Sequence, residues 1–255
     1  EFPIIPKVEK EFSFSIPAAV LCVGIDSTVF SAAITPTRPV LSGVFMQGEK
    51  DVLKLVATDS YRLAEKKIKL EKKIEKPFEC IIPVKTLLEL SRALSSKYDE
   101  ELVEVQVSKN QILFSVGSLE LTSRLIEGKF PEYEKIIPRE HRTRVEVDAD
   151  KLSVAAKRVS LFARENNNNV KLTANNDVKL QIYTDETRVG EERAELDISM
   201  NGENNKVSLN SQFLLDVLSN MKNKVIIELN EKLTPIVVRP QKTDDYLYII
   251  MPLKV

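Results

Sequence analysis

An internal repeat is the feature that most limits what this 255-residue chain can fold into. The stretch 82–90 (IPVKTLLEL) resembles 209–217 (LNSQFLLDV), and the matching Leu87 and Leu214 lie 127 residues apart. Apolar residues from Leu214 onward recur at the spacing of one helix face, so each stretch is predicted to open an amphipathic helix. Asn210 suits the N-cap of the second helix, and Pro83 suits the first turn of the other. The period predicts two copies of one unit of roughly 120 residues.

Strand patterns follow both predicted helices. Apolar and polar residues alternate over 103–107 and 112–116, which a polar turn joins, and again over 225–229 and 233–238. The segment 194–200 alternates in the same way. A period of two with polar turns predicts antiparallel hairpins with one buried face. The predicted fold class is therefore α+β, in two tandem copies.

The beginning of the chain matches the end of the first copy. Phe2-Pro3 precedes Ile4-Ile5-Pro6, much as Phe130-Pro131 precedes Ile136-Ile137-Pro138 at an offset of 128 residues between Phe2 and Phe130. A chance Phe-Pro near a terminus is the alternative interpretation. We expect residues 1–10 to be the end of a missing earlier unit, 11–137 to form a middle domain and 138–255 a C-terminal domain.

Charge is balanced overall, with 37 basic and 38 acidic residues, so any nucleic-acid surface must concentrate its cations on one face. The segment 148–164 is predicted to be a helix with Lys157 and Arg164 opposite its apolar side. Asp148 or Asp150 would cap it. Helices that carry cations outward could bind phosphates without reading sequence. The alternative for any single helix is an ordinary solvated face.

Signatures of catalysis are missing from the sequence. No Gly-x-Gly pair, nucleophile elbow or metal-binding box occurs, and the single histidine, His141, lies in a polar connector. Asp59 is interpreted as a turn former, and Cys22 and Cys80 as buried thiols. We therefore expect no enzymatic activity, no cofactor and no metal. No apolar run is long enough to span a membrane and no signal peptide is visible, which favours a cytoplasmic protein.

Several motifs resemble those of the bacterial DNA polymerase III β sliding clamps, in the same order and spacing over essentially the whole chain. They are Leu41-Ser42-Gly43-Val44, 56–64 (VATDSYRLA), 128–133 (GKFPEY), Ile137-Pro138 and 248–253 (YIIMPL). The resemblance implies two DNA-clamp folds, with antiparallel sheets outside and two helices per domain facing a DNA channel. It also implies a processivity factor for DNA replication whose complete form is a homodimeric ring, whereas this chain alone is expected to be monomeric.

The same resemblance implies a hydrophobic peptide-binding pocket. Its residues here would be Leu41, Thr58, Ser60, Tyr61, Arg62, Leu63, Pro131, Lys135, Ile136, Asn210, Phe213, Leu233, Pro235, Ile249, Met251, Pro252 and Leu253. Ser60-Tyr61 replaces a frequent Gly-His, Lys135 a common Arg, and Pro235 a small polar residue. The implied partners of this pocket are the replicative polymerase α subunit, the clamp loader δ subunit, and repair and translesion polymerases.

Duplex DNA is the other implied partner, bound through its phosphates and without sequence specificity. The residues expected to face DNA are Arg38, Lys85, Arg92, Lys151, Lys157, Arg158 and Lys222. The implied location is the bacterial cytoplasm, at the nucleoid. Two other functions would have to explain the same residues: a monomeric peptide-binding adaptor that never encircles DNA, and a hydrolase based on carboxylates. The absence of a paired-acid motif argues against the hydrolase.

Overall fold

The computed structural model describes residues 11–34, 37–98, 101–175, 178–186 and 190–254. Its contacts divide the chain into unit 1, which comprises residues 1–60 and 64–131, and unit 2, which comprises residues 61–63 and 132–255. The predicted remnant of an earlier domain, residues 1–10, lies outside the described residues.

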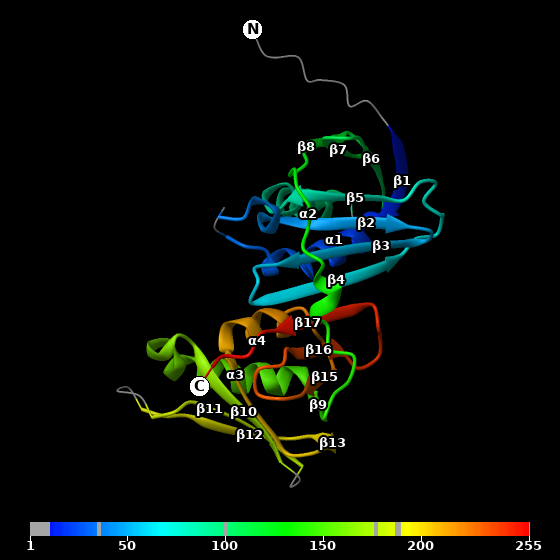
Figure 1. Cartoon of the computed structure of the whole chain (residues 1–255). Helices are drawn as coiled ribbons and strands as arrows, with labels where there is room; N and C mark the ends of the chain where they lie inside the picture. Colours follow the sequence, from blue (N-terminus) through cyan, green and yellow to red (C-terminus); the bar gives the residue numbers. More distant parts are fainter. Residues whose placement is uncertain (1–10, 35–36, 99–100, 176–177, 187–189, 255) are drawn as a thin grey trace. The chain divides into compact units, whose positions relative to one another are not determined.

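Unit 1 is built from two groups of strands and two helices (Figure 1). The elements are β1 (Phe12–Pro17), α1 (Ala18–Asp26), η1 (Val29–Ser31), η2 (Pro39–Ser42), β2 (Gly43–Glu49), β3 (Val52–Thr58), β4 (Arg62–Lys69), β5 (Phe78–Pro83), α2 (Val84–Lys97), β6 (Leu102–Val107), β7 (Gln111–Val116) and β8 (Leu119–Arg124). Neighbouring strands follow the orders β1-β6-β7-β8 and β4-β3-β2-β5. The helices α1 and α2 pack against each other.

Unit 2 repeats this plan. Its elements are η3 (Tyr133–Ile136), β9 (Thr143–Asp148), α3 (Ala149–Ala163), η4 (Arg164–Asn166), β10 (Asn169–Asn175), β11 (Lys179–Tyr183), β12 (Arg193–Asp197), β13 (Ser199–Gly202), β14 (Asn205–Asn210), α4 (Ser211–Leu218), β15 (Lys224–Leu229), β16 (Ile236–Pro240) and β17 (Tyr246–Ile250). The strand orders are β12-β11-β10-β14 and β13-β9-β15-β16-β17. Apart from the added β13, the connectivity is that of unit 1, so the predicted α+β repeat is confirmed.

Apolar faces bring the two strand groups and both helices of unit 1 into one core. Ile16 of β1, Leu21 of α1, Met46 of β2, Leu87 of α2 and Phe114 of β7 are all fully buried in it. Burial of such side chains contributes about 1.5–3 kcal/mol each. The sequence-predicted apolar side of 148–164 is likewise buried in unit 2.

Two helix starts agree with their predicted caps. The Asp148 carboxylate accepts a hydrogen bond from the Lys151 amide (2.9 Å), and the Asn210 side chain accepts one from Gln212 (2.8 Å). These bonds satisfy amides that a helix leaves unpaired at its first turn. Pro83 instead stands just before α2 and makes no side-chain cap.

Three local predictions were wrong or incomplete. The segment 194–200 is not one strand, because β12 and β13 belong to different strand groups and the buried Ile198 between them donates its amide to Val178. The strand predicted from Leu233 starts at Ile236, so Leu233 lies in a loop. The helix α1 was not recognised, because its sequence (AAVLCVGID) has no polar periodicity.

The short segment Tyr61–Leu63 clusters with unit 2 although it lies between parts of unit 1 in the sequence. Arg62 anchors it, because its buried guanidinium pairs with Asp216 of α4 and lies over the Phe213 ring, 4.6 Å from the ring centroid. Gln212 donates a second hydrogen bond to Asp216 (2.7 Å). The Met251 amide donates to the Tyr61 carbonyl (2.8 Å), so the segment is held at both its side chain and its backbone.

Removing one member of this ion pair should destabilise the protein. In Asp216→Ala the Arg62 side chain, only 10% exposed, would keep its charge without a carboxylate, which should lower the free energy of unfolding by about 2–3 kcal/mol. Urea denaturation measures the change. The control is Glu89→Ala, which breaks the exposed pair with Arg92 and should cost less than about 0.5 kcal/mol. Equal losses in both variants would contradict the anchoring role.

Candidate peptide-binding site

A cleft in unit 2 is bordered by four segments of the chain, of which strand β10 contributes Lys171. Strand β14 contributes Val207 and Ser208, the loop after β15 contributes Leu233, and the chain after β17 contributes Leu253. The cavity has a volume of about 480 Å³, within the usual range for ligand sites. Its walls are partly apolar, as peptide sites usually are.

The wall after β17 is held in place by the edge of a sheet. Strand β14 ends the order β12-β11-β10-β14, so one side of its backbone has no neighbouring strand in that order. The Leu253 amide donates to the Ser208 carbonyl on β14 (2.8 Å). Such edge carbonyls readily accept hydrogen bonds from extended chains. This bond fixes the backbone of Leu253 at the cleft, which Leu233 also lines.

Four lysines also line the cleft: Lys171, Lys206, Lys232 and Lys254. Lys171 forms an ion pair with Asp185. Among the described residues, no ion pair is found for the other three, although Lys206 lies 5.7 Å from the centroid of the Tyr183 ring. The cleft is therefore lined both by apolar side chains and by lysines, three of which have no ion pair among the described residues.

The pKa of Tyr183 is affected by the positive charges of Lys206 and Lys171. Burial by itself would raise its pKa, but hydrogen bonds with Thr173 and Lys206 and the charges of Lys206 and Lys171 outweigh burial. The pKa of Tyr183 consequently lies below its ordinary value. Arg193 adds a further cation, with its guanidinium 4.6 Å from the centroid of the same ring.

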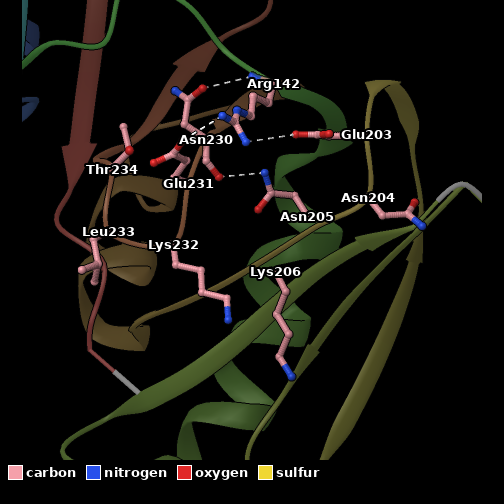
Figure 2. Close-up of a pocket in the computed structure, with 10 residues that line it drawn as sticks. All are labelled: Arg142, Glu203, Asn204, Asn205, Lys206, Asn230, Glu231, Lys232, Leu233 and Thr234. Atoms are coloured by element: carbon pink, nitrogen blue, oxygen red, sulfur yellow. Dashed lines mark hydrogen bonds and ion pairs between the residues drawn. The ribbon is translucent and has the colours of Figure 1, made fainter.

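An open polar cleft of about 660 Å³ adjoins the first and shares Lys206, Lys232 and Leu233 with it (Figure 2). Figure 2 shows hydrogen bonds and ion pairs among the polar residues of this cleft. Arg142 pairs with Glu231 (2.7 Å) and Glu203 (3.7 Å), and Asn205 donates to the Asn230 carbonyl (2.9 Å). Lys206 and Lys232 extend away from this network in the figure. The unmatched positive charge is thus concentrated at the end next to the apolar cleft.

Some of the sequence-predicted pocket residues come together in unit 2. Leu233 and Leu253 line the cleft, Met251 is bonded to Tyr61, and Arg62 contacts Phe213. The Phe213 carbonyl in turn accepts a hydrogen bond from Tyr248 (3.0 Å). Several of these residues offer surface to a ligand: Tyr61 (64% exposed), Leu233 (56%) and Ile136 (44%) are exposed, Lys135 is also exposed, and Asn210, Phe213, Pro235, Met251, Pro252 and Leu253 are half-buried.

Other predicted pocket residues are buried and present little surface. Arg62, Leu63 and Ile249 in unit 2 are at most 9% exposed. Leu41, Thr58, Ser60 and Pro131 belong to unit 1, where Leu41 and Thr58 are buried and Ser60 and Pro131 exposed. Their part in a common pocket stays a prediction.

Ser60 has a backbone conformation that explains the glycine frequent at this place in the resembling family. Its φ is 79°, in the left-handed region that favours glycine. The Ser60 amide donates to the Thr58 hydroxyl (3.1 Å), which stabilises the turn. The interpretation of Asp59 as part of a turn agrees with this geometry.

Sequence reasoning missed the residues that give the cleft its charge, Lys171, Lys206, Lys232 and Lys254, together with Val207 and Ser208. A signal existed, since Lys171 and Lys206 stand at outward positions of alternating strands. Their grouping, however, depends on strand register: Lys171 pairs with Tyr183 on one side and with Ser208 on the other. That register is not visible in the sequence alone.

The predicted DNA-facing cations are exposed, but two of them already form ion pairs with glutamates. Arg158 forms an ion pair with Glu192 (2.7 Å) and Arg92 one with Glu89 (2.7 Å). The others, Arg38, Lys85, Lys151, Lys157 and Lys222, are exposed. The expectation that the helices carry cations outward does not hold for α1, whose exposed face includes Val20 and Val23.

The described residues contain no group of three or more potential metal-ligating side chains. Burial, with a smaller contribution from Glu79, raises the pKa of the Cys80 thiol to about 12, so this cysteine stays protonated at neutral pH. The Nδ1 atom of the partly exposed His141 lies 3.8 Å from the Oε1 atom of Glu228.

In the part of the chain that the structure describes, no helix is long and apolar enough to cross a membrane.

Comparisons with known proteins agree across both units. The chain matches the family description "DNA polymerase III beta subunit, central domain" over residues 15–132 and "DNA polymerase III beta subunit, C-terminal domain" over residues 134–254. It is 32% identical to the beta sliding clamp of Staphylococcus aureus and 31% identical to that of Bacillus subtilis. All of this chain is matched in both, but only 67% and 68% of those proteins.

Solved structures give the same result. The sliding clamp of Bacillus subtilis has a TM-score of 0.95 at 30% identity, over all of this chain and 67% of that one. A Pseudomonas aeruginosa sliding clamp bound to griselimycin has a TM-score of 0.94 at 29% identity, over all of this chain and 68% of that one. The chain belongs to the DNA polymerase III beta subunit family, the bacterial β sliding clamps.

Proposed function

We propose that this chain supplies the two domains of a sliding clamp that carry its partner-binding pocket, in a ring that encircles duplex DNA and tethers a polymerase to it. The family consists of accessory subunits, so the chain acts in DNA replication without being an enzyme. The observation that carries the proposal is the match of both units to the two clamp domains in order. The complete protein would be a homodimeric ring in the bacterial cytoplasm at the nucleoid, and this chain alone a monomer.

DNA would be bound through cations on the helices. On α3, Lys151 and Lys157 are exposed, and the first acidic residue after the N-terminal turn is Glu165. Ammonium groups attract phosphates by charge alone and read no base edge, which suits a protein that must slide. Arg38, Lys85, Arg92, Arg158 and Lys222 would contribute to the same surface.

Partners would be bound through the cleft of unit 2 and the residues around it. Exposed Leu233 offers apolar surface beside the half-buried Leu253, and its burial by a peptide would supply hydrophobic free energy. The proposed occupants are short segments of the replicative polymerase α subunit, the clamp loader δ subunit, and repair and translesion polymerases.

The Leu233 side chain provides a direct test of the peptide site. Since it is 56% exposed, Leu233→Asp should leave the fold intact but place a charge in the apolar cleft. We expect affinity for a C-terminal peptide of the polymerase α subunit to fall by at least about tenfold in isothermal titration calorimetry. The matched control is Leu161→Asp on α3, where the leucine is 57% exposed. Equal affinity of both variants would place the peptide elsewhere.

The DNA surface can be tested by comparing two neighbouring cations. Arg158 is already paired with Glu192, whereas Lys157 has no ion pair among the described residues. In rings of the full-length protein, Lys157→Glu should therefore weaken DNA retention more than Arg158→Glu. Loss of one phosphate contact should also reduce the slope of log affinity against log salt by about 1. Retention on circular DNA, measured over a salt series, would contradict the proposal if neither variant changed it.

A further inference from the structure

The cleft of unit 2 has a counterpart at the equivalent place in unit 1. A cavity of about 570 Å³ there is lined by Glu79, Cys80 and Ile81 of β5, by the turn after β6 and by the chain after β8. Strands β5 and β14 occupy the same place in the two units, next to β2 and β10 respectively. Phe45 of β2 also lines this cavity, as Lys171 of β10 lines the cleft of unit 2, so each unit builds such a cleft from the same four parts of the repeat.

Backbone hydrogen bonds at matching positions support the equivalence of the two clefts. The Ile126 amide donates to the Ile81 carbonyl at 2.8 Å, and the Leu253 amide donates to the Ser208 carbonyl at 2.8 Å. The donors are 127 residues apart, and so are the acceptors, which is the offset of the repeat. The clefts can therefore be compared position by position.

The comparison shows that the charges are reversed. Glu79 in unit 1 corresponds to Lys206 in unit 2, and Glu127 corresponds to Lys254, each at the 127-residue offset. At an offset of 126 residues, Phe45 corresponds to Lys171. Two glutamates and one lysine line the first cleft, whereas four lysines and no acid line the second.

The pKa values of Cys80 and Tyr183 are shifted in part by the charged residues of the two clefts. In unit 1, burial and the negative charge of Glu79 both raise the pKa of Cys80. In unit 2, the charges of Lys206 and Lys171 help to lower the pKa of Tyr183 despite its burial. Both pKa directions agree with the charges of the side chains that line the two clefts.

We propose that the cleft of unit 2 is specific for acidic peptide segments, in which an apolar side chain packs against Leu233 and Leu253 while neighbouring carboxylates contact Lys206, Lys232 and Lys254. This inference rests on the peptide-binding function proposed above and names a chemical class of peptide within it. Lysines that lack carboxylate partners are complementary to acids, and such charges mainly set specificity and association rate. Lys206 and Lys232 also line the polar cleft of Figure 2. The positive charge of these two lysines is therefore accessible from both clefts.

The test compares two labelled peptides by fluorescence anisotropy. Both carry the same single leucine as the apolar side chain, flanked in one by three aspartates and in the other by three asparagines. The unaltered protein should bind the aspartate peptide about tenfold more tightly at low salt, and high salt should reduce this preference. In Lys206→Glu/Lys232→Glu/Lys254→Glu the preference should be lost or reversed, because carboxylates in the cleft repel the aspartates and not the asparagines.

A control variant has the same change in net charge elsewhere. Lys72→Glu/Lys73→Glu/Lys76→Glu alters three exposed lysines of the loop between β4 and β5 and should keep the preference. Equal binding of both peptides by the unaltered protein would overturn the acidic specificity but leave the peptide site intact. Binding of neither would count against the proposed function itself. Displacement of the aspartate peptide by a short DNA duplex would assign the lysines to phosphate and overturn the inference.

Discussion

One kind of backbone hydrogen bond shapes the candidate site in each unit. The chain that leaves the last strand of the unit donates an amide to the strand before the second helix, through Ile126 in unit 1 and Leu253 in unit 2. A strand edge exposes unpaired backbone groups, and covering them removes a site for unwanted association. Because the covering segment is a single stretch of chain, its side chains border a groove. The groove is thus a consequence of how the repeat completes its sheet.

Since the backbone sets the shape of the groove, side chains are free to set its chemistry. Glu79 and Lys206 stand at equivalent positions on equivalent strands, and both are exposed. Exchange of one for the other costs little stability, because exposed charges contribute little to folding. Duplication of the unit could therefore yield grooves of opposite charge without disturbing either core. The near-zero net charge of the chain conceals this local separation.

Much of the fold could be predicted because it depends on local pattern. The repeat offset, the apolar face of α3 and the caps at Asp148 and Asn210 can all be recognised in the sequence, and each has the predicted role. Predictions failed where tertiary structure outweighed pattern. The alternation of 194–200 continues through Ile198 although the chain passes from one strand group to another there. Helix α1 escaped notice because its exposed face is as apolar as its buried one.

The site was less predictable than the fold for a related physical reason. Motifs identify Leu233 and Leu253 through resemblance, but the four lysines around them come from four separate strand or loop segments that only the fold brings together. Arg62 illustrates the same dependence on tertiary structure. The resemblance places it in the pocket, and its guanidinium also pairs with Asp216 and lies over the face of Phe213. These contacts join residues 154 positions apart, and no local pattern predicts them. Arg62 thereby holds the segment Tyr61–Leu63, in which Tyr61 is exposed, and its own contact with a peptide stays a prediction.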